Sequence, residues 1–250
     1  MSRGLYTLTS GMLTQQRKID IASNNISNMN TVGYKKEQAI TTNFGNLLIN
    51  KYKQNGINKS SEPINNVSLI RTIEDSNTVH SQGSLDETGS ATDFAVIGAG
   101  FFAVNNEDRT LYTRKGSFNI DREGYLILKD IGRVQGEYGD VYIGTDKFEL
   151  TEDGSIYVSG EIVDKIGLYD FTDYNNLNKE GEGMFVSEEE PIAVASPRIV
   201  NKTLERSNVN ITEELTGIIA SQRSLQTASQ ALKLYDSIQE KAVNEIGRIN

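Results

Sequence analysis

The residues of this chain that could do chemistry are few and scattered. The single histidine, His80, stands in Thr78-Val79-His80-Ser81, so no second imidazole can share a metal ion with it. A serine could formally join it in a Ser-His-Asp arrangement, but no nucleophile elbow is present. We therefore expect a solvated or locally bonded His80, and we predict no catalytic residue, no cofactor and no metal ligand.

Four short motifs match ligand sites only in part. Gly98-Ala99-Gly100 is followed by the strand-like Phe101-Phe102-Ala103-Val104 and not by the helix that a phosphate loop requires, so we interpret it as a tight bend. The stretches 121–124 and 152–154 lack the further carboxylates of a calcium loop and read as turns. Consecutive carboxylates in Glu188-Glu189-Glu190 would point to opposite faces of a strand, which favours a solvated acidic run over a catalytic pair.

Composition excludes several function classes. The 250 residues contain no cysteine, which removes disulfides, thiolate metal sites and cysteine nucleophiles. The net charge is −9 and no basic run with interleaved aromatics occurs, so nucleic acid is not an expected partner. No run approaches the ~20 apolar residues of a membrane span, and the first residues lack the apolar stretch of about 7–15 residues of a secretory signal. We expect no membrane insertion, and export, if any, without a cleavable signal peptide.

The elements that could position an interaction site are two long amphipathic segments at the chain ends. Near the N-terminus, apolar residues recur at alternating steps of three and four, which predicts a helix over 1–32 with a heptad seam. Asparagines between 23 and 30 should weaken the helix so that it ends at 28–32, before Gly33. The seam residues are Leu5, Leu8, Met12, Ile19 and Ile26.

The C-terminal segment predicts a second helix, over 210–250. Asn210 followed by Glu213 is typical of a helix start, with the carboxylate near the positive helix end. The apolar spacing then continues for about 35 residues without a proline, with Gln222 at one seam position. Its principal seam residues are Leu215, Ile218, Leu225 and Leu232.

Between the ends, the hydrophobic period changes to two. We expect an extended linker at 33–84, a mainly antiparallel β domain at 85–195 and a return linker at 196–209, which makes the fold class α+β. Strand-like runs such as 93–97 and 141–143 are separated by turn signals, Asn105-Asn106 among them.

Each helical seam is flanked by polar residues, so its burial requires a partner. The two helices could pair in a coiled-coil-like domain, and further copies of the chain would cover what remains exposed. The charge distribution supports a division into helical ends that pack together and a middle that stays solvated. The middle of the chain holds 16 Lys/Arg against 27 Asp/Glu, and the ends are close to neutral. We therefore predict an assembly interface that comprises the nine seam residues together with Gly33, placed at the hinge.

Three ordered blocks of sequence resemble a known family. They are Ser10-Gly11-Met12 with Asn24–Lys35, then Asp93–Phe102 with Tyr112–Phe118 and Asp121–Leu126, and finally Leu204–Asn210 with Glu213-Glu214 and Gln222-Arg223. Together they are similar to the axial proteins of the bacterial flagellum, most closely to basal-body rod proteins. Val32 stands where the family usually has proline, and Ala99 where aspartate is common, while Gly33 can still supply a positive φ.

The resemblance implies a structural subunit of the rod, the drive shaft between motor and hook, required for flagellar assembly and motility. Implied partners are further copies of the chain, other rod and hook proteins and the flagellar type III export apparatus. The terminal helices would form an inner tube and the β domain would lie outside, in a basal body that crosses the cell envelope. The motif Tyr169–Tyr174 leans toward the proximal rather than the distal rod type.

Two alternatives compete with this interpretation. A coiled-coil surface stalk or adhesin would also place a β domain beside long helices, but it needs a signal peptide or anchor. A β-domain hydrolase with helical extensions would need a convergent carboxylate pair or a nucleophile with its base, and the sequence offers neither.

Overall fold

The computed structural model describes residues 3–43, 71–106, 109–145, 147–181 and 183–246. The chain divides into two compact units, each described by itself below. The first unit comprises residues 1–26, 37–77 and 210–250, and the second comprises residues 27–36 and 78–209.

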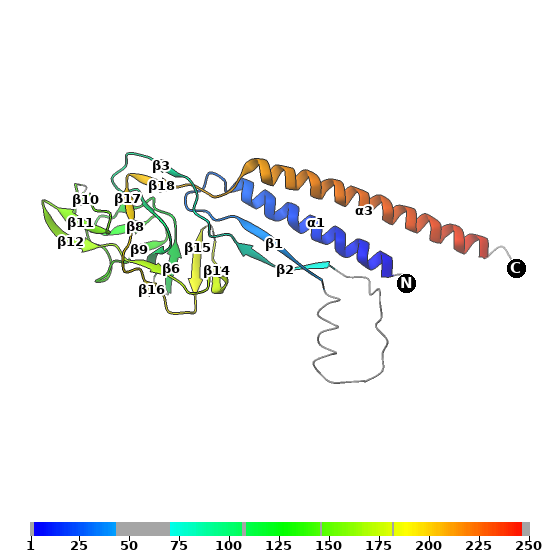
Figure 1. Cartoon of the computed structure of the whole chain (residues 1–250), viewed down its shortest axis with the longest axis horizontal. Helices are drawn as coiled ribbons and strands as arrows, with labels where there is room; N and C mark the ends of the chain where they lie inside the picture. Colours follow the sequence, from blue (N-terminus) through cyan, green and yellow to red (C-terminus); the bar gives the residue numbers. More distant parts are fainter. Residues whose placement is uncertain (1–2, 44–70, 107–108, 146, 182, 247–250) are drawn as a thin grey trace, which may run out of the picture. The chain divides into compact units, whose positions relative to one another are not determined.

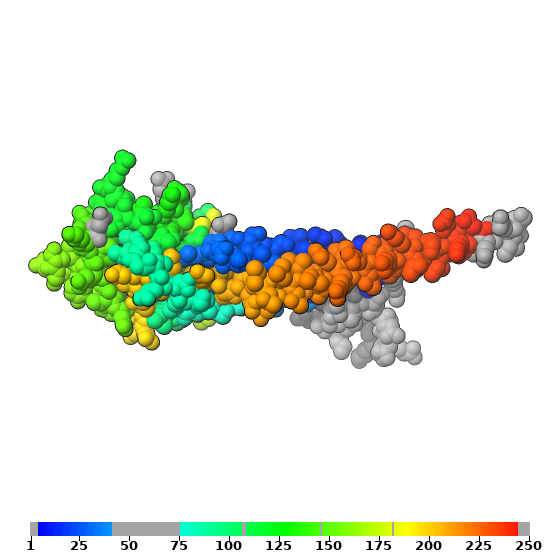
Figure 2. Space-filling view, turned by 90° about the horizontal axis from the view of Figure 1, so that it is seen from above, coloured from blue at the N-terminus to red at the C-terminus, as the bar shows by residue number. Residues whose placement is uncertain are grey.

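The first unit is dominated by two long helices. Helix α1 spans Arg3–Ser27 and helix α3 spans Ile211–Ile246, whose 36 residues correspond to about 54 Å at ~1.5 Å per residue. They lie side by side in Figures 1 and 2. Neither has a stretch apolar enough to span a bilayer, within the part of the chain that is described. The α+β class is confirmed, and the coiled-coil-like pairing of the helices stays a prediction.

The boundaries of both helices follow from local side-chain chemistry. Asn210 caps α3 as predicted, because its Oδ1 accepts the backbone N–H groups of Thr212 at 3.0 Å and Glu213 at 3.4 Å. Helix α1 ends at Ser27, just before the expected 28–32, where Thr31 N–H donates to the Asn28 carbonyl at 3.1 Å and closes a turn.

A two-stranded sheet completes the first unit. It pairs β1, Glu37–Asn43, with β2, Arg71–Thr78. Both strands lie in the expected linker 33–84, whose residues 44–70 fall outside the described residues.

The second unit is a β domain with short strands. In chain order these are β3 (Leu85–Glu87), β4 (Phe94–Val96), β5 (Phe101–Asn106), β6 (Arg109–Thr113), β7 (Asn119–Ile120), β8 (Leu126–Leu128), β9 (Gly132–Val134), β10 (Glu149–Leu150), β11 (Ser155–Val158), β12 (Glu161–Lys165), β13 (Leu168–Asp170), the 3-10 turn η1 (Tyr174–Asn176), β14 (Leu177–Lys179), β15 (Met184–Ser187), β16 (Ile192–Ala193), β17 (Ile199–Asn201) and β18 (Thr203–Glu205).

The largest sheet has the order β14-β15-β6-β5-β9-β8-β7, with β13 attached to β5 and β16 to β13. Smaller sheets are β10-β11-β12, β17-β4 and β18-β3. The strand pairings of this unit are antiparallel, as expected.

Two apolar clusters fill the β domain. The larger one includes Phe94, Phe102 and Phe118, and the rings of Phe102 and Phe118 meet edge to face with centroids 5.1 Å apart. The smaller one lies around Phe101 and Phe185. Side chains of β5 alternate between the two clusters, since Phe102 and Phe101 point to opposite faces of the strand.

Three local expectations differ from the structure. Asn105 and Asn106, expected to form a turn, continue β5 and pair with Thr110 and Arg109. The run 141–143 forms only an isolated bridge, between Tyr142 and Tyr125. The stretch 196–209, expected to be a return linker, contributes β17 and β18, because the β domain uses it to cover the edges of β4 and β3.

Candidate assembly site

The predicted seam residues are only partly buried within the single chain. Leu215 is 48% exposed, and none of the others reaches full burial. Gln222 is exposed, whereas its neighbour Ser221 is buried, so the buried stripe of α3 runs through Ser221. The half-buried positions are Leu5, Leu8, Met12, Ile19 and Ile26 on α1, with Ile218, Leu225 and Leu232 on α3. Their role as an assembly interface stays a prediction.

Further apolar residues lie outside the predicted seams and are exposed. The sequence reasoning missed Ile219, Leu234 and Ile238, although Leu234 and Ile238, four residues apart, lie on one face of the helix. Tyr6 and Leu13 are comparably exposed on α1. Apolar side chains that stay in solvent on several faces of a helix are typical of subunits that bury them in an assembly.

Gly33 occupies a position that only glycine fits. Its φ is +68°, and an added Cβ would lie 2.5 Å from the carbonyl carbon of Arg114 and 2.5 Å from the nitrogen of Lys115. Its N–H donates to the Glu205 carbonyl at 2.8 Å. The residue predicted as a hinge is therefore held by backbone packing inside the β domain, and hinge motion at Gly33 stays a prediction.

Next to Gly33 lies a buried charge cluster, formed by Lys35, Arg114 and Glu205. Lys35 Nζ lies 2.5 Å from Glu205 Oε1, and Arg114 Nη1 lies 3.3 Å from Glu205 Oε2. The three side chains are 1%, 5% and 1% exposed, respectively. Two cations thus share one carboxylate in the interior, a costly arrangement unless further hydrogen bonds compensate it.

Backbone groups supply most of that compensation. The N–H of Gly83 donates to Glu205 Oε1 at 2.9 Å, Lys35 Nζ donates to the Ser81 carbonyl at 2.9 Å, and Arg114 Nη2 donates to the Gly98 carbonyl at 2.6 Å. Arg114 Nε is buried without a hydrogen-bond partner in the described part of the chain.

Burial is the main influence on the Lys35 ammonium and lowers its pKa from the ordinary value. The Glu205 carboxylate works against that shift through its charge and its hydrogen bond, and the Arg114 cation works with it. Glu205 is therefore the counter-charge that offsets the cost of burying both cations.

The charge cluster joins the three sequence blocks of the chain. Lys35 closes the first block, Arg114 lies in the second, and Glu205 lies near the start of the third. Sequence reasoning did not identify it, because a lysine next to Tyr34 and an arginine after a strand look like ordinary surface residues. One feature of the sequence could have indicated the cluster: each of the three blocks places a charged residue next to apolar or aromatic residues.

Asparagine side chains bind the backbone in each of the two units. Asn208 Oδ1 accepts the Lys36 N–H at 2.7 Å, and its Nδ2 donates to the Val79 carbonyl at 2.8 Å. In the first unit, the buried Asn25 exchanges two hydrogen bonds of 2.9 Å with the backbone of Glu37. The Asn25 side chain therefore binds the first residue of β1 to the end of α1, in addition to the helix-weakening role that we predicted.

His80 differs from expectation. Its ring is half-buried among aromatic rings, with centroids 4.9 Å from Tyr174 and 5.2 Å from Phe185, and its Nδ1 is buried without a hydrogen-bond partner in the described structure. Burial, followed by the charges of Lys35 and Arg114, lowers the pKa of His80 to about 4. His80 packs as a neutral ring among these side chains because the β domain begins at Thr78, before the expected boundary at 85.

Known proteins match the chain along its whole length. Residues 5–35 match the family described as "Flagella basal body rod protein", residues 95–163 the "Flagellar hook protein FlgE/F/G D1 domain", and residues 200–245 the "Flagellar basal body rod FlgEFG protein C-terminal". The architecture and these matches define an axial structural protein of the bacterial flagellum.

Individual relatives narrow this class. The flagellar basal-body rod protein FlgG of Bacillus subtilis is 30% identical over 261 residues, covering 98% of this chain and 99% of the relative. The rod protein FlgF of Caulobacter vibrioides is 28% identical over 100% of both chains. The hook-basal body complex protein FlhO of Bacillus subtilis is 26% identical, also over 100% of both. The chain belongs to the flagellar basal-body rod protein family and is a structural subunit of the rod, and the surface-stalk alternative is not supported.

Replacing Glu205 should strongly destabilise the β domain. Glu205→Gln keeps the shape but leaves Lys35 and Arg114 without a counter-charge, and the expected loss is about 3–5 kcal/mol of unfolding free energy. Urea unfolding followed by tyrosine fluorescence measures it, since the chain contains no tryptophan. Glu190→Gln, at an exposed position, serves as the control and should change stability by less than about 0.5 kcal/mol. Equal effects of the two substitutions would contradict a stabilising role for the cluster.

Lowering the pH should reduce the unfolding free energy of the protein through the protonation of His80. Unfolded His80 binds a proton below about pH 6.5, whereas the folded ring, with a pKa of about 4, does so only at lower pH. Stability therefore falls as the pH drops from about 6.5 toward 4, by about 1–2 kcal/mol once the partial exposure of the ring is allowed for. His80→Phe should lose this part of the pH dependence in urea titrations across that window. Identical slopes in the two proteins would rule the effect out.

Proposed function

We propose that this rod subunit assembles through its two terminal helices, which pair with each other and with the helices of neighbouring copies and of other rod and hook proteins. The observation that carries the proposal is the incomplete burial of apolar residues along α1 and α3 in the single chain. Each Leu-, Ile- or Met-sized side chain that becomes fully buried contributes about 1.5–3 kcal/mol, so association has a large driving force.

The distribution of these residues supports contacts with more than one neighbour. Leu225 and Leu232 are half-buried on one stripe of α3, whereas Ile219 and Leu234 are exposed on other faces of the same helix. A single pairing of α1 with α3 cannot cover all of these faces. Additional copies can, which favours a helical array in which the helices form an inner tube.

The β domain suits an outward position in such an array. The middle of the chain carries 27 acidic against 16 basic residues, and Glu188-Glu189-Glu190 is exposed there. An acidic surface stays hydrated and discourages unspecific association between neighbouring domains. The proposed role is mechanical and not catalytic.

Membership of the rod family supports delivery by the flagellar type III export apparatus and a final position in the basal body, across the cell envelope. It also makes the other rod and hook proteins the natural neighbours of this chain. The motif Tyr169–Tyr174 supports a proximal position along the rod.

A charge placed in the helical seam should abolish assembly. Leu225→Asp, or Leu8→Asp on α1, puts a carboxylate where the proposal requires an apolar contact, so cells should be non-motile and lack hooks. Motility plates and electron microscopy of basal bodies measure the effect, and near-UV circular dichroism should show an intact β domain.

The matched control is Gln226→Asp, at the exposed position next to Leu225, which should leave motility unchanged. Motile cells with normal basal bodies in the Leu225→Asp strain would sink the proposal.

The position along the rod is tested by deleting the gene. A proximal subunit supports everything assembled after it, so basal bodies of the deletion strain should lack the rod entirely in electron micrographs. A short rod that lacks only its distal part would instead identify a distal subunit.

A further inference from the structure

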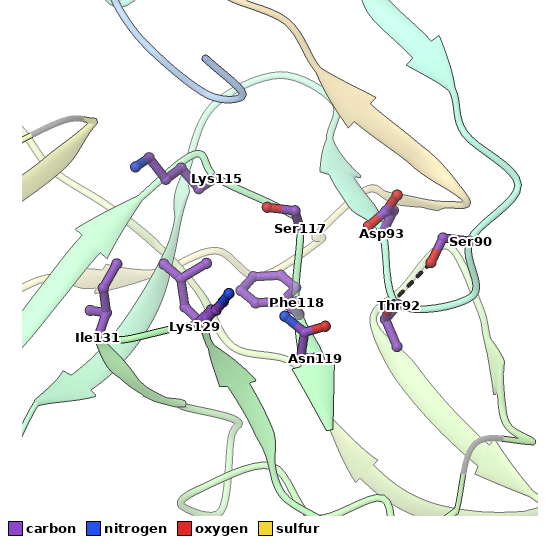
Figure 3. Close-up of a pocket in the computed structure, with 10 residues that line it drawn as sticks. Ser90, Thr92, Asp93, Lys115, Ser117, Phe118, Asn119, Lys129 and Ile131 are labelled. Carbon is purple, nitrogen blue, oxygen red and sulfur yellow. Dashed lines mark hydrogen bonds between the residues drawn. The ribbon is translucent and has the colours of Figure 1, made fainter. Parts of the chain in front are cut away.

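The pocket of the β domain offers no free apolar surface. It measures about 330 Å³, and its lining is mostly polar, with Asp93 and Lys115 among its residues (Figure 3). The apolar side chains that reach it, Phe118 and Leu128, are buried in the larger core cluster. The two helices of the first unit, in contrast, carry large apolar side chains that are more than half exposed.

Helix α1 carries one exposed apolar stripe, formed by Tyr6 and Leu13. Their side chains are 59% and 67% exposed. The two residues are seven positions apart, which is about two helical turns, so they lie on one face and about 10 Å apart along the axis. The half-buried seam residues Leu8 and Met12 lie on another face of α1, so their burial leaves this stripe uncovered in the single chain.

Helix α3 carries a second stripe near its C-terminal end. Leu234 and Ile238 are 65% and 64% exposed, and the exposed Ala242 continues their spacing of four residues. All side chains from 236 to 244 are exposed. Helix α3 also continues past the first residues of α1 in Figures 1 and 2. The described part of the chain therefore does not cover this end of α3.

Charge indicates which helix suits which stripe. Within its bounds, α1 has three basic residues against one acidic residue, whereas α3 has three against five. The net charges are therefore +2 and −2. Contact between like helices of two copies would be repulsive, and contact between α1 of one copy and α3 of another is attractive. The lengths also match, since the stripe on α3 extends over about 12 Å from Leu234 to Ala242.

We propose that, in the assembled rod, the stripe of Tyr6 and Leu13 on α1 packs against the stripe of Leu234 and Ile238 on α3 of a neighbouring copy. The inference rests on the proposed assembly through the helices and names the two surfaces that meet. The two helices run antiparallel in Figure 1, and copies that share one orientation keep this relation. Leu13 then lies opposite Leu234, and Tyr6 lies opposite Ile238.

The two stripes are different surfaces of one chain, so the contact is heterologous. Each copy offers α1 to one neighbour and α3 to another, and such contacts repeat along an open helical array rather than closing into a dimer.

Single cysteines test this contact, because the natural chain has no cysteine. One strain produces two full-length chains with different tags, one with Leu13→Cys and the other with Leu234→Cys. Oxidised basal bodies should contain disulfide-linked dimers that carry both tags, since the contact brings the two Cα atoms within about 7 Å. Dimers that carry only one kind of tag should stay at background.

The matched control replaces Leu234→Cys by Asp236→Cys. Asp236 is also exposed, but two positions along the helix turn its side chain by about 200°, away from the stripe. This pair should give no dimers with both tags. Tyr6→Cys with Ile238→Cys is a second contact pair, for the case that a variant of the first pair does not enter rods, and it should give dimers with both tags.

The outcomes separate this contact from the function itself. Normal rods that contain the variants but form no dimers would overturn the contact and leave the rod function standing. Dimers of Leu13→Cys chains alone, or of Leu234→Cys chains alone, would overturn it as well, because like helices would then meet. Equal yield from the control pair, or a cross-link to a different protein, would also overturn it. Absence of the wild-type chain from basal bodies would instead overturn the proposed function.

Discussion

The β domain depends on a single carboxylate in its interior. Glu205 faces two cations and the N–H of Gly83, and its own backbone carbonyl accepts the N–H of Gly33. Because an unpaired buried charge costs several kcal/mol, Lys35 and Arg114 can occupy their positions only while Glu205 occupies its own. The charge pairs therefore join the segment after α1, the residues that follow β6 and the strand β18, and the Asn208 side chain adds hydrogen bonds to the backbone of Lys36 and Val79.

The helices leave many of their apolar side chains exposed. Their apolar residues find incomplete cover within one chain, with Leu215 and Ile219 exposed on α3 and Leu13 on α1. The β domain closes its core around Phe94 and Phe102 and is complete by itself. One chain thus combines a β domain whose core is closed with helices whose apolar side chains are only partly covered, which is the division that the proposed assembly through the helices requires.

The sequence predicted those features that have local causes. The Asn210 cap, the length of α3 and the bend at Gly98-Ala99-Gly100 follow from a few adjacent residues, and the structure confirms them. Features that depend on distant partners were missed. Strand β17 exists because Ile199 pairs with Val96, and no local pattern reveals that pairing. The charge cluster and the aromatic surroundings of His80 likewise require the tertiary fold, since lysine, arginine and histidine carry no periodic signal of their own.

The salt bridge between Lys35 and Glu205 joins residues 170 positions apart, and this separation has a kinetic consequence. A chain that emerges from the ribosome N-terminus first cannot close its charge cluster, nor pair β17 and β18 with their partner strands, until residue 205 has been synthesised. Contacts between such distant residues form slowly, because closing a long loop costs chain entropy before the contact can stabilise the fold. The native β domain therefore cannot be completed until residues 199–205 have been synthesised.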